Sequence, residues 1–153
     1  MADQDKINWT DCVGVLCYKD GYVLMIQRGQ APRKGEWSIP GGRIEAGESE
    51  QVAALRELME ETGVTADLGE KIATIPAIFE GYHYMLHDYI ATWTGGEPRA
   101  GDDAADCAFV PIEAVSGMEL WEKTREVILE GYDLWQDTKI SQDQSAKGHR
   151  QNR

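Results

Sequence analysis

The chain has 153 residues, 42% of them hydrophobic, which is the size and apolar content of one domain with its own core. Its 15 Lys and Arg against 27 Asp and Glu give a net charge of −12, which would repel the phosphates of a nucleic acid and disfavours such a partner. No stretch reaches the roughly eighteen apolar residues of a membrane span, and the N-terminus lacks the basic and apolar regions of a secretion signal. We therefore expect a cytoplasmic protein with no membrane partner.

The first forty residues predict a β-hairpin and a loop. Two apolar runs within residues 11–28 flank Asp20-Gly21, a dipeptide that favours a tight hairpin turn. Residues 29–35 are rich in Pro, Gly and basic side chains, as in a surface loop. We expect the following Pro40-Gly41-Gly42 to interrupt any regular strand pairing.

The next segment predicts a helix over residues 49–62. Ser49 is a favourable N-cap, and Gly63 is a favourable residue just past the helix end. At 100° per residue, one arc is expected to pack against the core and the other is acidic. The packing arc holds Val52, Leu55, Leu58, Met59 and Thr62, and the acidic arc holds Glu57, Glu60 and Glu61.

The second half predicts more strands and a closing helix. Residues 71–79 and 83–94 have β-type patterns, and 108–110 can form another short strand. Residues 120–135 have helical composition with several large apolar side chains. Strands before and after a central helix indicate a mixed α/β fold.

The C-terminal residues differ from the rest in composition. Residues 137–153 are polar and nearly free of large apolar side chains, so we expect a mobile tail there. The folded domain is accordingly predicted to cover residues 1–136.

The acidic arc of the predicted helix suggests a metal site. Glutamates three and four residues apart repel one another unless a counter-charge intervenes. Oxygen ligands without His or Cys suit Mg²⁺, with Mn²⁺ as the alternative. The small side chains of Ala53 and Ala54 beside this arc would leave space for a ligand. The alternative is that the arc is simply the solvated face of the helix.

The residues around this arc favour the metal site, because they match a known signature. The pattern G-x5-E-x7-R-E-U-x-E-E-x-G-U, in which U is a bulky apolar residue, is that of the Nudix hydrolases. Its fixed positions are occupied by Gly42, Glu48, Arg56, Glu57, Leu58, Glu60, Glu61, Gly63 and Val64. Residues 37–41 and the preceding hairpin are also similar to that family, so the resemblance covers about the first half of the chain.

The resemblance implies a fold and a set of roles. The fold is an α/β/α sandwich with a mixed β-sheet between helices. Glu57 would bind metal and help to activate water, Glu60 and Glu61 would be metal ligands, and the carbonyl of Gly41 would add another. The implied reaction is attack of water on one phosphorus of a diphosphate, without a covalent enzyme intermediate.

Two further motif residues would assist the metal ligands. Arg56 is predicted to serve catalysis by orienting them, and Glu48 to act from the layer behind them, as such neighbours do at metal sites generally. The alternative is a structural salt bridge between Arg56 and Glu48.

The downstream half offers candidates for substrate choice. Residues 96–111 resemble the ADP-ribose pyrophosphatase-like branch of the family. Asp103, rather than the adjacent Asp102, is our preferred acidic ligand or base in that loop, although an ordinary polar loop is the alternative.

Other residues could contact a nucleotide. Arg28 and Arg33 could bind phosphate, or merely solvate their loop, and Tyr82 could stack on adenine, or pack in the core. Asp88 faces away from His87 among apolar neighbours, which marks it as a candidate for a buried functional carboxylate.

Three functions are compatible with these residues. The first is Mg²⁺-dependent cleavage of a small nucleoside diphosphate derivative, with ADP-ribose giving AMP and ribose 5-phosphate. The second is release of pyrophosphate from a nucleoside triphosphate. The third, a nucleotide-binding module without catalysis, is disfavoured because the motif is intact. A homodimer is left open.

Overall fold

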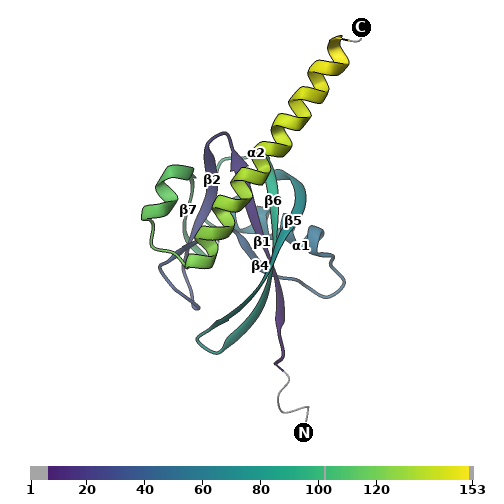
Figure 1. The fold of residues 1–153 in the computed structure, drawn as a ribbon. Coiled ribbons are helices and arrows are strands. Elements are labelled where there is room, and N and C mark those ends of the chain that lie inside the picture. The colour runs from purple at the N-terminus through teal and green to yellow at the C-terminus, as the bar shows by residue number, and fades with distance from the viewer. Residues whose placement is uncertain (1–6, 102, 152–153) are drawn as a thin grey trace.

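A computed structural model describes residues 7–101 and 103–151. Within these ranges the chain forms seven strands and two α-helices (Figure 1). They are β1 (Thr10–Lys19), β2 (Tyr22–Arg28), β3 (Trp37–Ser38), β4 (Gly41–Arg43), α1 (Glu50–Thr62), β5 (Thr65–Phe79), β6 (Tyr82–Gly95), β7 (Ala104–Pro111) and α2 (Glu122–Gln151). A short 3-10 helix, Ile112–Gly117, precedes α2.

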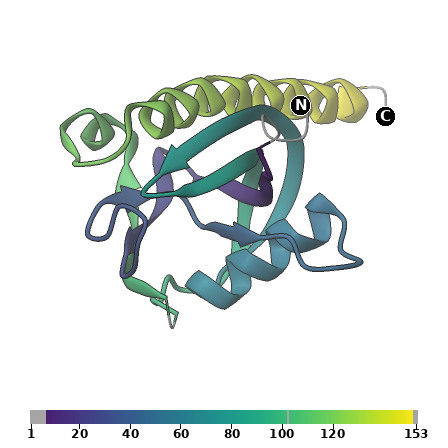
Figure 2. The ribbon, with the colours of Figure 1, turned by 90° about the horizontal axis from the view of Figure 1, so that it is seen from below.

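The strands form one mixed sheet between the two helices. The strand order is β3-β2-β1-β6-β5, with β4 paired to β1 and β7 paired to β2. The central pair β1–β6 is parallel, and the other pairs are antiparallel. Figure 2 shows α2 along one face of the sheet and α1 on the opposite side. This is the mixed α/β sandwich that the sequence predicts.

Strand β1 is buried on both faces, which explains its nearly continuous apolar sequence. Val13, Val15 and Cys17 face the core under α1, whereas Leu16 and Tyr18 face the core under α2. The two hydrophobic clusters therefore share β1 as their common wall.

The expected hairpin is present, and the expected interruption at Pro40-Gly41-Gly42 is only partly right, because Pro40 lies between β3 and β4 but the two glycines do not break the pairing. Gly41 and Gly42 begin β4, in which Gly41 pairs with Gly14 of β1. A Cβ on Gly41 would lie 2.0 Å from the carbonyl oxygen of Val13, so only glycine permits this approach. The proline takes part as an acceptor, since the Pro40 carbonyl receives the N–H of Val15 at 2.8 Å.

Helix α1 begins and ends where its capping residues predict. The Ser49 hydroxyl accepts the N–H of Val52 at 3.1 Å. Gly63 adopts a left-handed conformation at φ 71°, and its N–H donates to the Met59 carbonyl at 2.9 Å.

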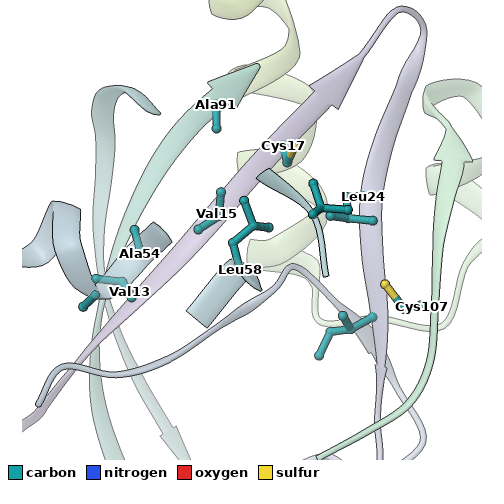
Figure 3. Packing of buried hydrophobic residues seen from close by; sticks show 11 residues of the cluster. Val13, Val15, Cys17, Leu24, Ala54, Leu58, Ala91 and Cys107 are labelled. Atoms are coloured by element: carbon teal, nitrogen blue, oxygen red, sulfur yellow. The ribbon is translucent and has the colours of Figure 1, made fainter. Parts of the chain in front are cut away.

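The predicted packing face of α1 is only partly right. Leu58 and Thr62 are buried, but Val52 (57% exposed), Leu55 (40%) and Met59 (46%) are exposed. The helix instead packs through Ala53 and Ala54, whose small side chains let it lie close to the sheet. Figure 3 shows Ala54 and Leu58 among Val13, Val15 and Leu24. The two alanines therefore pack against the sheet and do not themselves border open space, contrary to the role predicted for them.

Helix α2 continues through residues 137–151, the segment for which the sequence predicts a mobile tail. Its last buried side chain, among those described, is Trp135, and the side chains of 136–141 are exposed. In Figure 1 this end of the helix extends beyond the sheet. A polar segment without proline can continue a helix that the core has already nucleated. The mobility of the segment and the domain end at residue 136 stay predictions.

The helices of the described ranges were also compared with membrane-spanning helices. None of them combines the length and the apolar composition needed to cross a bilayer.

The orientation of α1 is tested by truncating one buried and one exposed apolar residue of the same helix. We expect Leu58→Ala to lower the free energy of unfolding by about 2–5 kcal/mol, because it leaves a cavity in the core. Val52→Ala should change it by less than about 0.5 kcal/mol. Urea titration of both variants measures the difference, and equal losses would contradict the orientation described here.

Candidate active site

A cavity of about 500 Å³ runs through a gap in the sheet. The gap arises because β2 and β4 pair with the same edge of β1, β2 at Tyr18–Lys19 and β4 at Cys12–Gly14. Glu57 and Glu61 of α1 line the cavity, as do Asp88 of β6 and residues of α2. Its aromatic lining consists of Trp37, Phe79, Tyr82, Tyr84 and Trp121.

Glu57 packs directly on the backbone of Gly42. A Cβ on Gly42 would lie 2.5 Å from the carboxylate carbon of Glu57. The absence of a side chain at Gly42 therefore lets the first residue of the motif lie against a glutamate of its helix. Burial raises the pKa of the Glu57 carboxyl, and the neighbouring Arg56 opposes this rise.

Arg56 joins the acidic residues of the motif. Its Nε and Nη2 donate to Glu48 at 2.6 and 2.9 Å, and its Nη1 donates to Glu57 at 2.8 Å and Glu60 at 3.1 Å. Nη2 also donates to the carbonyl of Arg43 at 3.0 Å. These bonds lower the pKa of Glu48 and raise that of Arg56. Arg56 therefore bridges Glu48, Glu57 and Glu60 and does not itself line the cavity. Its orienting role stays a prediction, since the alternative salt bridge to Glu48 is also present.

Glu61 is the most strongly perturbed acid of the motif. Burial, together with repulsion from Glu57 and Asp103, raises the pKa of its carboxyl to about 7, against the opposing hydrogen bond from the Gly41 N–H at 3.0 Å. Glu60 differs, because its side chain is 59% exposed and lies outside the cavity lining. The structure thus brings Glu57 and Glu61 together, with Glu60 at their margin.

Other predicted residues lie along the same cavity. Asp103 lines it and accepts a hydrogen bond from the side chain of Gln30 at 3.2 Å. Arg28 Nε donates to the Pro32 carbonyl at 2.5 Å. Asp102 lies outside the described residues.

Two more predicted residues stand on the aromatic side. The guanidinium of Arg33 lies over the ring of Phe79 at 4.9 Å and pairs with Glu36 at 2.8 Å. Tyr82 stacks on Tyr84 with ring centroids 5.5 Å apart, so it belongs to the cavity wall and not to the core. All of the predicted contact residues therefore share one cavity.

A family model for the NUDIX domain matches residues 9–130, most of the chain. The chain belongs to the Nudix family. The family predicted from the motif is confirmed, and the match extends the resemblance well beyond the first half of the sequence.

Three curated relatives carry different substrates in their names. An RNA pyrophosphohydrolase of Erythrobacter litoralis is 45% identical over 76 residues, covering 49% of this chain and 46% of the relative. An ADP-ribose pyrophosphatase of Methanocaldococcus jannaschii is 30% identical over 125 residues, covering 78% and 70%. A CTP pyrophosphohydrolase of Escherichia coli is 36% identical over 106 residues, covering 69% and 78%. The chain thus spans about half the length of the first of these relatives.

A solved structure confirms the predicted Nudix sandwich. The bifunctional NMN adenylyltransferase/ADP ribose pyrophosphatase of Francisella tularensis, complexed with AMP and a manganese ion, matches this chain with a TM-score of 0.74. The match covers 86% of this chain and 43% of that chain, at 21% identity, and shows a shared fold.

The Nudix residues fit a divalent metal ion by their donor chemistry. Glu57 and Glu61 are partly buried carboxylates with raised pKa values, and a cation between them would relieve their repulsion. Within the described ranges, no three Asp, Glu, His or Cys side chains already converge as a complete set of ligands.

The sequence gives little signal for the remaining lining residues. Gly14, Thr124 and Val127 line the cavity, yet they carry no motif and are brought there by strand pairing and helix packing. Trp121, which the helical pattern assigns to the core, also lines it and packs edge-to-face on Phe79 at 4.7 Å. Asp88 is buried as its neighbours predict.

The burial of Asp88 has a consequence for stability. Desolvation raises the pKa of its carboxyl to about 6, from 3.8 in an unfolded chain, with His87 opposing the rise. Between these values the folded state holds more protons, so the free energy of unfolding falls as pH rises.

We therefore expect Asp88→Asn to raise the Tm of the metal-free protein at pH 7–8. The corresponding gain in the free energy of unfolding is on the order of 3 kcal/mol at most, and it should shrink as the pH falls toward 4. Thermal unfolding monitored by circular dichroism between pH 4 and 8 measures it. A gain that does not vary with pH would contradict the assigned ionisation.

Proposed function

We propose that this Nudix protein hydrolyses the diphosphate of a nucleoside diphosphate derivative in the presence of Mg²⁺, with ADP-ribose as the first candidate substrate. The observation that carries the proposal is that Glu57 and Glu61 share one cavity with Arg28, Arg33 and an aromatic wall. Buried acids can hold the metal, basic groups can bind phosphate, and aromatic rings can contact a base.

Each residue has a task in this scheme. Glu57 and Glu61 hold the divalent ion, which when bound offsets the charge of the diphosphate and lowers the pKa of water. Glu57 Oε1, fixed by Arg56, is the proton acceptor for the attacking water. Arg28 and Arg33 bind the phosphate oxygens, and Asp103 is a further carboxylate in the lining of the same cavity. Tyr82 lies against the base or ribose.

The relatives support ADP-ribose without deciding it. The Methanocaldococcus relative covers more of this chain than the other two do, and the Francisella structure contains AMP. The second candidate, a nucleoside triphosphate, is favoured by the relative named CTP pyrophosphohydrolase, whose length is the best covered of the three. The products distinguish them: AMP and ribose 5-phosphate from ADP-ribose, but a nucleoside monophosphate and pyrophosphate from a triphosphate. Chromatographic analysis of both reactions tests the choice.

The role of Glu57 is tested by removing its charge. Glu57→Gln should keep the fold and lower kcat by about 10²- to 10⁴-fold, because the amide cannot accept the proton from water. Steady-state kinetics with Mg²⁺ measures this, with Glu113→Gln, an exposed residue of the 3-10 helix, as the matched control. Full Mg²⁺-dependent activity in Glu57→Gln would refute the assignment.

The two remaining glutamates should differ in metal binding. Glu61→Gln should raise the Mg²⁺ concentration for half-maximal activity by about tenfold or more, since its carboxylate lies in the cavity. Glu60→Gln should raise it less, because this side chain is mostly exposed. Activity as a function of Mg²⁺ concentration, supported by calorimetric titration of Mn²⁺, measures both. A larger effect at Glu60 would mean that the bound state rearranges α1.

A further inference from the structure

Asp88 is a buried carboxylate to which the proposed hydrolysis assigns no task. It is only 4% exposed and lines the cavity. The side-chain hydrogen bonds and ion pairs found among the described residues do not include it, and none of the fully buried side-chain oxygens there lacks a partner, so the Asp88 carboxylate is open to the cavity. Burial dominates its raised pKa. A buried carboxylate without a protein partner is costly unless a ligand satisfies it.

The backbone makes room for this carboxylate. Gly14 faces Asp88 across the β1–β6 pair, and a Cβ on Gly14 would lie 2.3 Å from Asp88 Oδ1 and 2.9 Å from Ile39 Cδ1. Gly14 also pairs with Gly41 of β4, so Asp88, Gly14 and Gly41 form one row across three strands. Asp88 therefore lies two strand spacings, ~10 Å between Cα atoms, from the Gly41 that Glu61 contacts.

The surroundings of Asp88 suit a base and not a phosphate. Ile39, Ile75 and Val127 line the cavity on the side of α2, where Asp88 shares a strand face with Ile90. The neighbouring His87 points to the other face, where its ring nitrogens contact Asp11 and Lys71. A negative group among apolar walls repels phosphate, whereas it can accept hydrogen bonds from the edge of a flat, uncharged ring.

We propose that Asp88 binds the exocyclic amino group of the substrate's nucleobase and so makes the enzyme prefer adenine or cytosine nucleotides over their hypoxanthine or uracil counterparts. A carboxylate accepts hydrogen bonds from an amino group, but it directs negative charge at a keto oxygen in the same place. The inference rests on the proposed function, because it takes the diphosphate to lie at the end of the cavity with Glu57 and Glu61. The ribose then spans the distance between them and Asp88.

The test compares matched pairs of substrates that differ only in the amino or keto group. kcat/KM is measured for ADP-ribose against its hypoxanthine analogue and for CTP against UTP, in the wild type and in Asp88→Asn. Asparagine keeps the shape but offers a donor as well as an acceptor. The wild type should have the higher kcat/KM for the amino member of each pair. In Asp88→Asn the ratio of the amino to the keto kcat/KM should fall roughly ten- to hundredfold. Asp67→Asn, an exposed aspartate on β5, is the matched control and should keep the preference.

Two outcomes overturn the inference. The first is an equal loss of kcat/KM for all four substrates in Asp88→Asn, which would mean that Asp88 supports the fold or the reaction and does not contact the base. The second is a wild type that does not distinguish the amino from the keto member of either pair.

The failure of the proposed function is a separate result. If the wild type hydrolyses none of the four compounds, that function is wrong, and the base preference is then measured from the Kd values of AMP and IMP with Mn²⁺. A preference for AMP that Asp88→Asn abolishes would still support the inference. Equal Kd values in the wild type would overturn it as well.

Discussion

The site depends on three glycines, Gly14, Gly41 and Gly42, that lie too close to carboxylates or to backbone for any side chain to fit. Gly41 lets β4 pair with β1, Gly42 lets the Glu57 carboxylate pack on the chain, and Gly14 leaves room for Asp88. A single methyl group at any of them would meet atoms closer than van der Waals contact allows. The cavity is therefore shaped as much by missing side chains as by the residues that line it.

The electrostatics of the cavity follow from this packing. Glu57, Glu61 and Asp88 are held away from water, and burial raises the pKa of all three. Of these three acids Arg56 pairs only with Glu57, and its other partners are Glu48 and Glu60. A divalent cation between these carboxylates would offset the negative charge that an anionic substrate meets in a protein with a net charge of −12, so the proposed metal and substrate would favour each other's binding.

Local patterns were sufficient where the physics is local. Ser49 and Gly63 predicted the ends of α1, and Asp20-Gly21 predicted the first hairpin, because capping and turn geometry depend on a few adjacent residues. The periodicity of α1 was misleading, since close packing selected the alanines over the larger Val52 and Met59. Similarly, Gly41 and Gly42 joined a strand after Pro40 because β1 was there to pair with them.

The sequence by itself determined the family and the acidic motif, because nine fixed positions specify the acidic side chains and the residues that cap their helix. Only the tertiary structure decided which acids meet. It left Glu60 at the surface, placed Glu61 beside Gly41, and brought Asp88 into the same cavity across the paired strands. That difference has a physical reason: a motif specifies residues close in the chain, whereas the depth and the neighbours of a carboxylate depend on strands and helices that pack from distant segments.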